Sequence, residues 1–174
     1  MKTVADYVIS IPDFPKEGII FRDVTSVVND ADGLKLAVDS LMEKLEGIDF
    51  DVIAGAEARG FLFGMPLAYL LHKPFVLIRK KGKLPRDTVS EAYDLEYGTA
   101  EIEIHKDAIK PGQKVVLVDD LIATGGTMAA AAHLVEKLGG EVVCLLFLME
   151  LAGLNGRERL AGYRVESVIC YEGK

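Results

Sequence analysis

The chain has 174 residues, half of them apolar and 27% charged, which suits one folded domain and excludes wholesale disorder. The 20 basic and 27 acidic residues leave a formal net charge of −7, which argues against nucleic-acid binding through bulk charge. No apolar run approaches the ~18 residues that span a bilayer, and the charged, proline-containing start is unlike a signal peptide. Cys144 and Cys170 lie in apolar runs, which predicts small buried hydrophobes in a reducing compartment. We therefore expect a cytoplasmic protein without nucleic-acid or membrane partners.

The first half of the chain alternates helical and strand-like patterns. Apolar residues at helical spacing predict a helix over residues 33–46, and the short apolar run 51–55 predicts a buried strand. A second helix is expected over residues 60–72 and a second strand over Phe75–Ile78, which ends in cations. Such alternation is typical of βαβ units.

The second half continues this rhythm with a third strand over residues 114–120 and a helix from Gly126 that two glycines close at 139–140. Further strands are expected over residues 141–150 and 163–171. These runs are apolar throughout, so we expect strands buried on both faces of a parallel sheet with helices on each side.

Ligands of such sheets bind beyond the carboxyl ends of the strands. Polar or glycine-rich sequence follows four of the expected strands, at residues 57–60, 79–83, 119–127 and 150–151. We therefore expect the functional site at this edge of the sheet.

The polar stretch 84–106 interrupts the alternation without a helix of its own, and its part "AEIEIH" predicts one arm of a hairpin. Long excursions of this kind often form lids or binding loops. A disordered insertion is the alternative.

The stretch "VVLVDDLIATGGT", residues 115–127, combines an apolar strand, two aspartates and a Gly-Gly turn that opens a helix. The unpaired N–H groups and the dipole of a helix start attract a phosphate group, and Thr124 and Thr127 add hydroxyl donors. The lysine-containing Walker pattern and the G-x-G-x-x-G dinucleotide loop are both absent, which favours a phosphate monoester. A purely structural turn is the alternative.

Two adjacent carboxylates, Asp119 and Asp120, precede this turn. They can accept hydrogen bonds from the vicinal hydroxyls of a ribose whose 5-phosphate lies in the turn. Their negative charge would also stabilise a developing oxocarbenium ion. The alternative is a solvated acidic turn.

The same stretch resembles the phosphoribosyl diphosphate signature of the type I phosphoribosyltransferases. Residues 14–23, 54–64, 76–85 and 93–112 resemble, in this order, segments of the members of that family that use adenine. The resemblance extends from about residue 11 to about residue 172.

The resemblance implies an α/β fold of the type I phosphoribosyltransferase kind, with a parallel sheet and flanking helices in a single domain over residues 1–174. This domain would comprise a small N-terminal hood at about 1–32, a core at about 33–174 and a flexible loop at about 84–106. It also implies transfer of the 5-phosphoribosyl group from phosphoribosyl diphosphate to adenine in purine salvage, with AMP and diphosphate as products. Mg²⁺ would be held mainly through the diphosphate, without a firm protein ligand, and the enzyme would be a homodimer.

The resemblance also assigns roles by position. Asp119 and Asp120 would hold the ribose hydroxyls, and the 5-phosphate would lie on Ala123, Thr124, Gly125, Gly126 and Thr127. The cations expected at the diphosphate are Arg59, Arg79, Lys80 and Lys83, some of them reaching a partner subunit; a solvated basic face is the alternative. The loop at Glu57–Ala58 resembles one that often holds a cis peptide in this family.

Two further groups of residues would act on the base. Glu96 is the candidate for proton transfer with the purine, and Tyr97 for closing over the reacting centre; Glu96 is otherwise an exposed loop acid. The adenine pocket would be built from Ile20, Phe21, Arg22 and Leu151. Arg22 would contact the base or fix the loop, or else form a salt bridge with Asp23.

Two competing functions are a purine-sensing regulator with the same fold and an enzyme of this family that acts on another base. A regulator needs an added DNA-binding segment and a basic face, neither of which this sequence offers. The segments at 18–23 and 95–107 favour adenine over xanthine, hypoxanthine or orotate.

Overall fold

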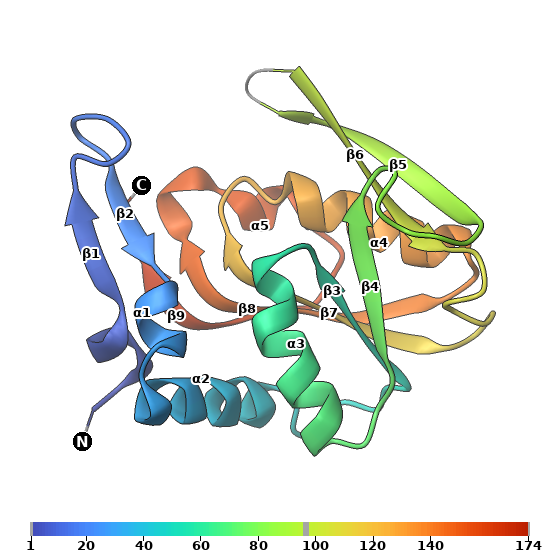
Figure 1. Cartoon of the computed structure of the whole chain (residues 1–174), viewed down its shortest axis with the longest axis horizontal. Helices are drawn as coiled ribbons and strands as arrows, with labels where there is room; N and C mark the ends of the chain where they lie inside the picture. Colours follow the sequence, from blue (N-terminus) through green and yellow to red (C-terminus); the bar gives the residue numbers. More distant parts are fainter. Residues whose placement is uncertain (1, 96–97, 174) are drawn as a thin grey trace.

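The computed structural model describes residues 2–95 and 98–173, and its centre is a seven-stranded sheet (Figure 1). The strand order is β5-β6-β4-β3-β7-β8-β9. The strands are β3 (Val52–Ala56), β4 (Phe75–Lys80), β5 (Thr88–Leu95), β6 (Gly98–His105), β7 (Lys114–Ile122), β8 (Glu141–Leu151) and β9 (Val165–Tyr171). β4, β3, β7, β8 and β9 pair in parallel, as their uninterrupted apolar sequences predict.

Helices cover both faces of this sheet. On one face lie α2 (Ala31–Lys44) and α3 (Arg59–Leu70), whose buried side chains form one core cluster with alternate residues of β7 and β8. On the other face lie α4 (Gly126–Lys137) and the short α5 (Gly156–Arg159), which follows the single turn η2 (Ala152–Leu154). The carboxyl ends of the strands, where the candidate site is expected, therefore lie at the edge of the sheet between the two helical layers.

A small antiparallel unit, called the hood below, precedes the sheet and lies within the residues 1–32 that the resemblance assigns to a hood. It consists of η1 (Val4–Tyr7), β1 (Ile9–Pro12), β2 (Ile20–Asp23) and α1 (Thr25–Val28). In Figure 1 this unit stands at one side of the molecule, with β2 facing the ends of the central strands. The peptide bond Phe14–Pro15 in the connection between β1 and β2 is cis.

The polar segment at 84–106 is more regular than its sequence predicts. Its described part forms a long antiparallel hairpin of β5 and β6, and β6 pairs antiparallel with the end of β4. The hairpin therefore extends the sheet, and the expected arm at "AEIEIH" is confirmed as part of β6. Val89 and Tyr93 of β5 pack on the core under α4, which gives this strand a buried side.

The elements expected in the core are confirmed within a few residues at each end. One prediction about the side chains is wrong: Cys144 is buried, but Cys170 is exposed on the edge strand β9. β9 pairs with β8 only, so its other edge has no neighbouring strand and an apolar sequence there does not guarantee burial. Over the described residues, no helix has the length and apolar character needed to cross a membrane.

Candidate active site

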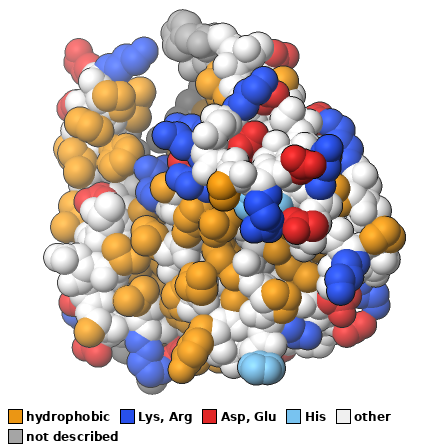
Figure 2. Space-filling view, turned by 45° about the vertical axis from the view of Figure 1, so that its right-hand side comes forward, with side chains coloured by type: hydrophobic (Ala, Val, Ile, Leu, Met, Phe, Trp, Pro, Cys, Tyr) orange, Lys and Arg blue, Asp and Glu red, His pale blue; other side chains and the backbone are white. Residues whose placement is uncertain are grey.

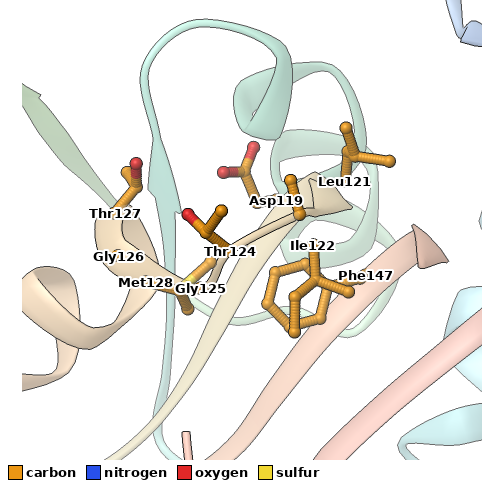
Figure 3. A pocket seen from close by; sticks show the side chains of 10 residues that line it. Asp119, Leu121, Ile122, Thr124, Gly125, Gly126, Thr127, Met128 and Phe147 are labelled. Carbon is orange, nitrogen blue, oxygen red and sulfur yellow. The ribbon is translucent and has the colours of Figure 1, made fainter. Parts of the chain in front are cut away.

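The turn between β7 and α4 encloses a small cavity at the carboxyl end of the sheet. Its volume is about 90 Å³, and its lining comprises Asp119, Leu121, Ile122, Ala123, Thr124, Gly125, Gly126, Thr127, Met128 and Phe147. In Figure 3 the side-chain oxygens of Thr124, Thr127 and Asp119 point to one side of the cavity, and Ile122 and Phe147 lie on the other. All five residues expected to hold a phosphate therefore line one cavity at a helix start.

Two glycines shape this turn. Gly125 is the residue before α4 and has a φ of +81°, which side chains rarely adopt. A Cβ on Gly125 would lie 2.7 Å from the carbonyl oxygen of Gly156, and a Cβ on Gly156 would lie 2.4 Å from that of Ala123. The turn therefore rests directly on the backbone of α5, and Gly156 is a site residue that local sequence reasoning missed.

The two aspartates at the end of β7 occupy different environments. Asp120 is buried, and its Oδ2 accepts a hydrogen bond of 2.6 Å from Nε of Arg59. Asp119 accepts a hydrogen bond of 2.8 Å from the N–H of Asp120. Burial raises the pKa of Asp119 well above its ordinary value, and repulsion from the neighbouring Asp120 carboxylate is the second-largest cause. A carboxyl group whose pKa is strongly raised by burial and a neighbouring charge is typical of a binding site.

Arg59 lies at the start of α3, whereas the other expected cations lie at the end of β4 and in the turn after it. It is the first residue of α3, and Gly60 after it allows this helix to approach β7: a Cβ there would lie 2.7 Å from the carbonyl oxygen of Val118. Its guanidinium binds Asp120, and both side chains line the apolar pocket described below.

Glu57 organises the loop after β3, where the Glu57–Ala58 peptide bond is cis. Its Oε2 accepts hydrogen bonds from Nε of Arg79 at 3.1 Å and from the N–H of Lys80 at 3.0 Å. Burial raises the pKa of Glu57, but these two hydrogen bonds outweigh burial and leave the pKa below its ordinary value. The ionised carboxylate therefore ties the ends of β3 and β4 together.

The basic turn after β4 is shaped by Glu103, a buried residue of β6 that sequence reasoning missed. Its Oε1 accepts hydrogen bonds from the N–H groups of Gly82 at 3.1 Å and Leu84 at 3.2 Å. The carbonyl oxygen of Lys83 in turn accepts a hydrogen bond from Nη1 of Arg79 at 3.4 Å. Lys80 and Lys83 are exposed on this turn.

A second, apolar cavity of about 270 Å³ lies between the hood and the strand ends. Its lining comprises Ile19, Ile20, Phe21, Arg22, Arg59, Asp120, Leu121, Met149, Leu151 and Leu154. The four residues expected to form the adenine pocket all belong to it. Two apolar walls, one from β2 and one from β8, suit the two faces of a flat aromatic ring.

Arg22 fixes the hood against the end of β9. Its guanidinium lies 4.0 Å from the centre of the Tyr171 ring, and its Nη1 donates a hydrogen bond to Oγ of Ser10. In the described part of the chain, the buried Nε of Arg22 has no hydrogen-bond partner. Asp23 instead accepts hydrogen bonds from Thr25, so the alternative salt bridge between Arg22 and Asp23 is not formed within the described residues.

Glu150, the polar residue before Leu151, attaches α5 to the end of β8. Glu150 is buried and forms a two-pronged ion pair with Arg157 of α5, with Nε–Oε1 and Nη2–Oε2 distances of 2.8 Å and 2.7 Å. Ser167 also donates a hydrogen bond to Glu150. This pair holds α5 under the turn that carries Gly125.

The predictions for Glu96 and Tyr97 fall outside the described residues. Within residues 2–95 and 98–173, no group of three or more acidic, histidine or cysteine side chains is arranged to hold a metal ion. The carboxylate oxygens of Asp119 and Asp120 are nevertheless ligands that suit Mg²⁺, which commonly completes its shell with water and substrate phosphates.

The parallel sheet, with a glycine turn and a carboxylate pair at its strand ends, is that of a phosphoribosyl transferase domain, because the family described as "Phosphoribosyl transferase domain" matches residues 26–172. An adenine phosphoribosyltransferase of Agathobacter rectalis is 72% identical over 174 residues, which cover both chains completely. The chain belongs to the adenine phosphoribosyltransferase family.

Solved structures agree with this assignment. The crystal structure of adenine phosphoribosyltransferase from Thermoanaerobacter pseudethanolicus has a TM-score of 0.93 and 54% identity, covering 97% of this chain and 98% of the other. The enzyme from Saccharomyces cerevisiae, in complex with an imino-altritol bisphosphate and adenine, has a TM-score of 0.88 and 39% identity, covering 95% and 96%. The expected α/β fold is therefore confirmed.

Proposed function

We propose that the two cavities at the end of β7 hold the two ends of one nucleotide while the chain transfers a 5-phosphoribosyl group to adenine. The observation that carries this proposal is their shared wall. Leu121 lines both cavities, Asp119 lines the polar one and Asp120 the apolar one. A sugar with its 5-phosphate on the turn and its base under the hood would therefore lie across the two carboxylates.

The reaction exchanges one bond at the anomeric carbon of the ribose. The bond to the diphosphate oxygen breaks, its electron pair leaves with diphosphate, and N9 of adenine forms the new bond that gives AMP. Positive charge develops on the ring as the first bond loosens, and Asp119 and Asp120 would stabilise this charge while accepting hydrogen bonds from the ribose hydroxyls. Glu96 is proposed to take up the proton of the purine and Tyr97 to close over the site.

The leaving diphosphate requires positive charge near the strand ends. We propose that Arg79, Lys80 and Lys83 supply it, supported by the Glu57 and Glu103 contacts that fix the loop and the turn on which they lie. Arg59 would act between diphosphate and ribose because it is bound to Asp120. Mg²⁺, held chiefly by the diphosphate and water, would neutralise part of the charge of the leaving group.

Selectivity for adenine would come from backbone groups near Ile20 and Phe21. A carbonyl oxygen there would accept a hydrogen bond from the 6-amino group of adenine and would repel the 6-oxo group of hypoxanthine or guanine. The apolar walls of the pocket give stacking contacts to any purine and contribute little to this discrimination.

A coupled assay with purified protein, phosphoribosyl diphosphate and Mg²⁺ against a panel of bases tests the reaction. Adenine should be converted to AMP, and hypoxanthine, xanthine and orotate should react at least ~10³-fold more slowly. Turnover of hypoxanthine without turnover of adenine would contradict the proposal. Glu96→Gln should slow kcat more than it raises KM if Glu96 moves the proton.

We also propose that the enzyme is a homodimer through α3 and β4. Leu62, Met65, Tyr69 and Leu70 of α3 are all more than 40% exposed, and Leu77 of β4 lies beside them at 37%. Figure 2 shows hydrophobic side chains gathered in the middle of one face of the molecule, with Lys and Arg side chains around them. An exposed apolar patch of this kind is typical of a protein interface.

Sedimentation of Met65→Glu tests this interface. The wild type should sediment as a dimer and the variant as a monomer, because a buried charge without a partner opposes association. Ile9→Glu on the hood, which is 58% exposed, is the control and should remain dimeric. A dimeric Met65→Glu would place the interface elsewhere.

The cellular role is inferred from the reaction. An enzyme that makes AMP from free adenine and phosphoribosyl diphosphate serves purine salvage, and we propose that it does so in the cytoplasm. Expression in a bacterial strain that depends on external adenine and lacks its own activity should restore growth, and the inactive Gly125→Val variant should not.

A further inference from the structure

The hydroxyl group of Tyr93, in the hairpin of β5 and β6, reaches the turn at residues 123–127, which we call the phosphate turn. Tyr93 lies in β5 and Thr127 in the first turn of α4, yet their hydroxyl oxygens are only 3.2 Å apart. The Tyr93 ring also covers the start of the helix, because a Cβ on Gly126 would lie 3.6 Å from its Cδ2. Tyr93 thus touches two of the five residues of the turn without lining the cavity itself.

The chemistry of the two hydroxyl groups fixes the direction that this hydrogen bond must take in a complex. In this structure the Thr127 hydroxyl donates to the Tyr93 hydroxyl. A Thr127 hydroxyl that binds a phosphate oxygen in the turn would give its single proton to that oxygen instead. The Thr127 oxygen could then only accept, and the Tyr93 hydroxyl, which has a proton of its own, can reverse the hydrogen bond and donate. We propose that Tyr93 is a positioning residue for the 5-phosphate: it donates to Thr127 and thereby aims the Thr127 proton at the phosphate.

Three contacts hold β5 in the place that this role requires. Glu91 forms an ion pair with Lys137 and a hydrogen bond of 3.3 Å with Nδ1 of His133, both in α4, and Lys137 Nζ donates to the carbonyl oxygen of Ser90 at 3.0 Å. These contacts lie further along α4 than Thr127. Tyr93 is therefore fixed against the same helix whose first turn would carry the phosphate.

Removal of one hydroxyl group tests the proposal, which rests on the proposed function of the turn as the 5-phosphate site. Tyr93→Phe should raise the Kd for ribose 5-phosphate and the KM for phosphoribosyl diphosphate by about three- to tenfold, the value of one neutral hydrogen bond. The Kd for inorganic diphosphate and the KM for adenine should remain within twofold of the wild type. A general loss of structure would instead weaken all of these ligands.

Tyr163→Phe is the matched control. Tyr163 also donates a hydrogen bond to α4, but to Glu136 at the opposite end of the helix, at 2.7 Å. The same substitution there should leave the Kd for ribose 5-phosphate unchanged. Ribose 5-phosphate binding that is equally weakened in both variants would contradict the proposal, because the loss would then come from destabilisation of α4.

A double-mutant cycle with Thr127→Val distinguishes action through Thr127 from any separate effect. Tyr93→Phe should weaken ribose 5-phosphate binding in the wild type but not further in Thr127→Val. Additive losses, or wild-type affinity in Tyr93→Phe, would overturn the proposal. The proposed function fails in a different way, through a wild type that binds ribose 5-phosphate and phosphoribosyl diphosphate but does not convert adenine.

Discussion

Nε of Arg59 lies 2.6 Å from Oδ2 of the buried Asp120, which joins the start of α3 to the end of β7 across 61 positions of sequence. The Arg59 side chain is half-exposed, whereas that of Asp120 is only 7% exposed. The cation therefore faces the ligand side of the site while it neutralises one of the two carboxylates.

We predict that Arg59→Gln lowers kcat/KM for phosphoribosyl diphosphate by about 10- to 100-fold, because a buried acid loses its partner and the ligand loses a cation. Steady-state kinetics measure this effect. Arg164→Gln, which removes an arginine paired with Glu166 on the outer part of the fold, is the control and should change kcat/KM by less than about twofold. Equal kinetics for both variants would show that the Arg59–Asp120 pair has no part in the reaction.

Gly125 is predicted to tolerate no side chain. Gly125→Val combines a φ of +81° with a clash of the new Cβ against the Gly156 carbonyl oxygen, 2.7 Å away. Binding of phosphoribosyl diphosphate, measured by calorimetry, should be abolished while circular dichroism still reports a folded protein. Gly47→Ala has a similar φ of +76° but open space around it, so it should cost about 1 kcal/mol of stability and leave binding intact. Wild-type affinity in Gly125→Val would refute the phosphate turn.

Glu103 is predicted to act on the diphosphate through the turn at residues 80–84. Glu103→Gln replaces charged acceptors of the Gly82 and Leu84 N–H groups with weaker neutral ones, and should raise the KM for phosphoribosyl diphosphate about three- to tenfold. Glu101→Gln on the same strand removes the charge that pairs with the exposed Lys81 and leaves the Glu103 contacts intact, so it should leave this KM nearly unchanged. A Glu103→Gln enzyme with a normal KM would make the residue purely structural.

Asp119 is predicted to lower the stability of the ligand-free protein at neutral pH. Its folded-state pKa lies above the unfolded value of about 3.9, so folding becomes less favourable as pH rises from about 4 toward the folded-state pKa. Asp119→Asn should therefore raise Tm at pH 7 and lose this advantage near pH 4, while activity falls. Thermal unfolding of both proteins from pH 4 to pH 8 measures the difference, and a constant Tm offset across this range would contradict the prediction.

The order of the central strands and helices could be predicted because each element carries a local signal. Val115–Val118 are apolar without alternation, and a strand buried on both faces needs such a run. Only the "AEIEIH" arm of the hairpin of β5 and β6 was predicted, because it alternates polar and apolar residues, whereas β5 is covered only where α4 packs on it. Cys170 shows the same dependence on neighbours, because only the position of β9 at the sheet edge leaves it exposed.

The proximity of the glycine turn to the carboxylate pair could be predicted because Asp119–Thr127 are contiguous, so their short spacing keeps them together in any fold that forms this strand and helix. The partners of these residues come from distant parts of the chain: Gly156 supports Gly125, Arg59 pairs with Asp120, and Tyr93 meets Thr127. No sequence pattern reports such contacts.

The sequence by itself determined the sheet, the helix start and the acids that follow the central strand, because hydrophobic periodicity and chain connectivity act over a few residues. Only the tertiary structure decided that Arg59 neutralises Asp120, that Gly156 packs against the turn at Gly125, and that Tyr93 contacts Thr127. These relations depend on distances between elements, and such distances are set by packing across the whole core.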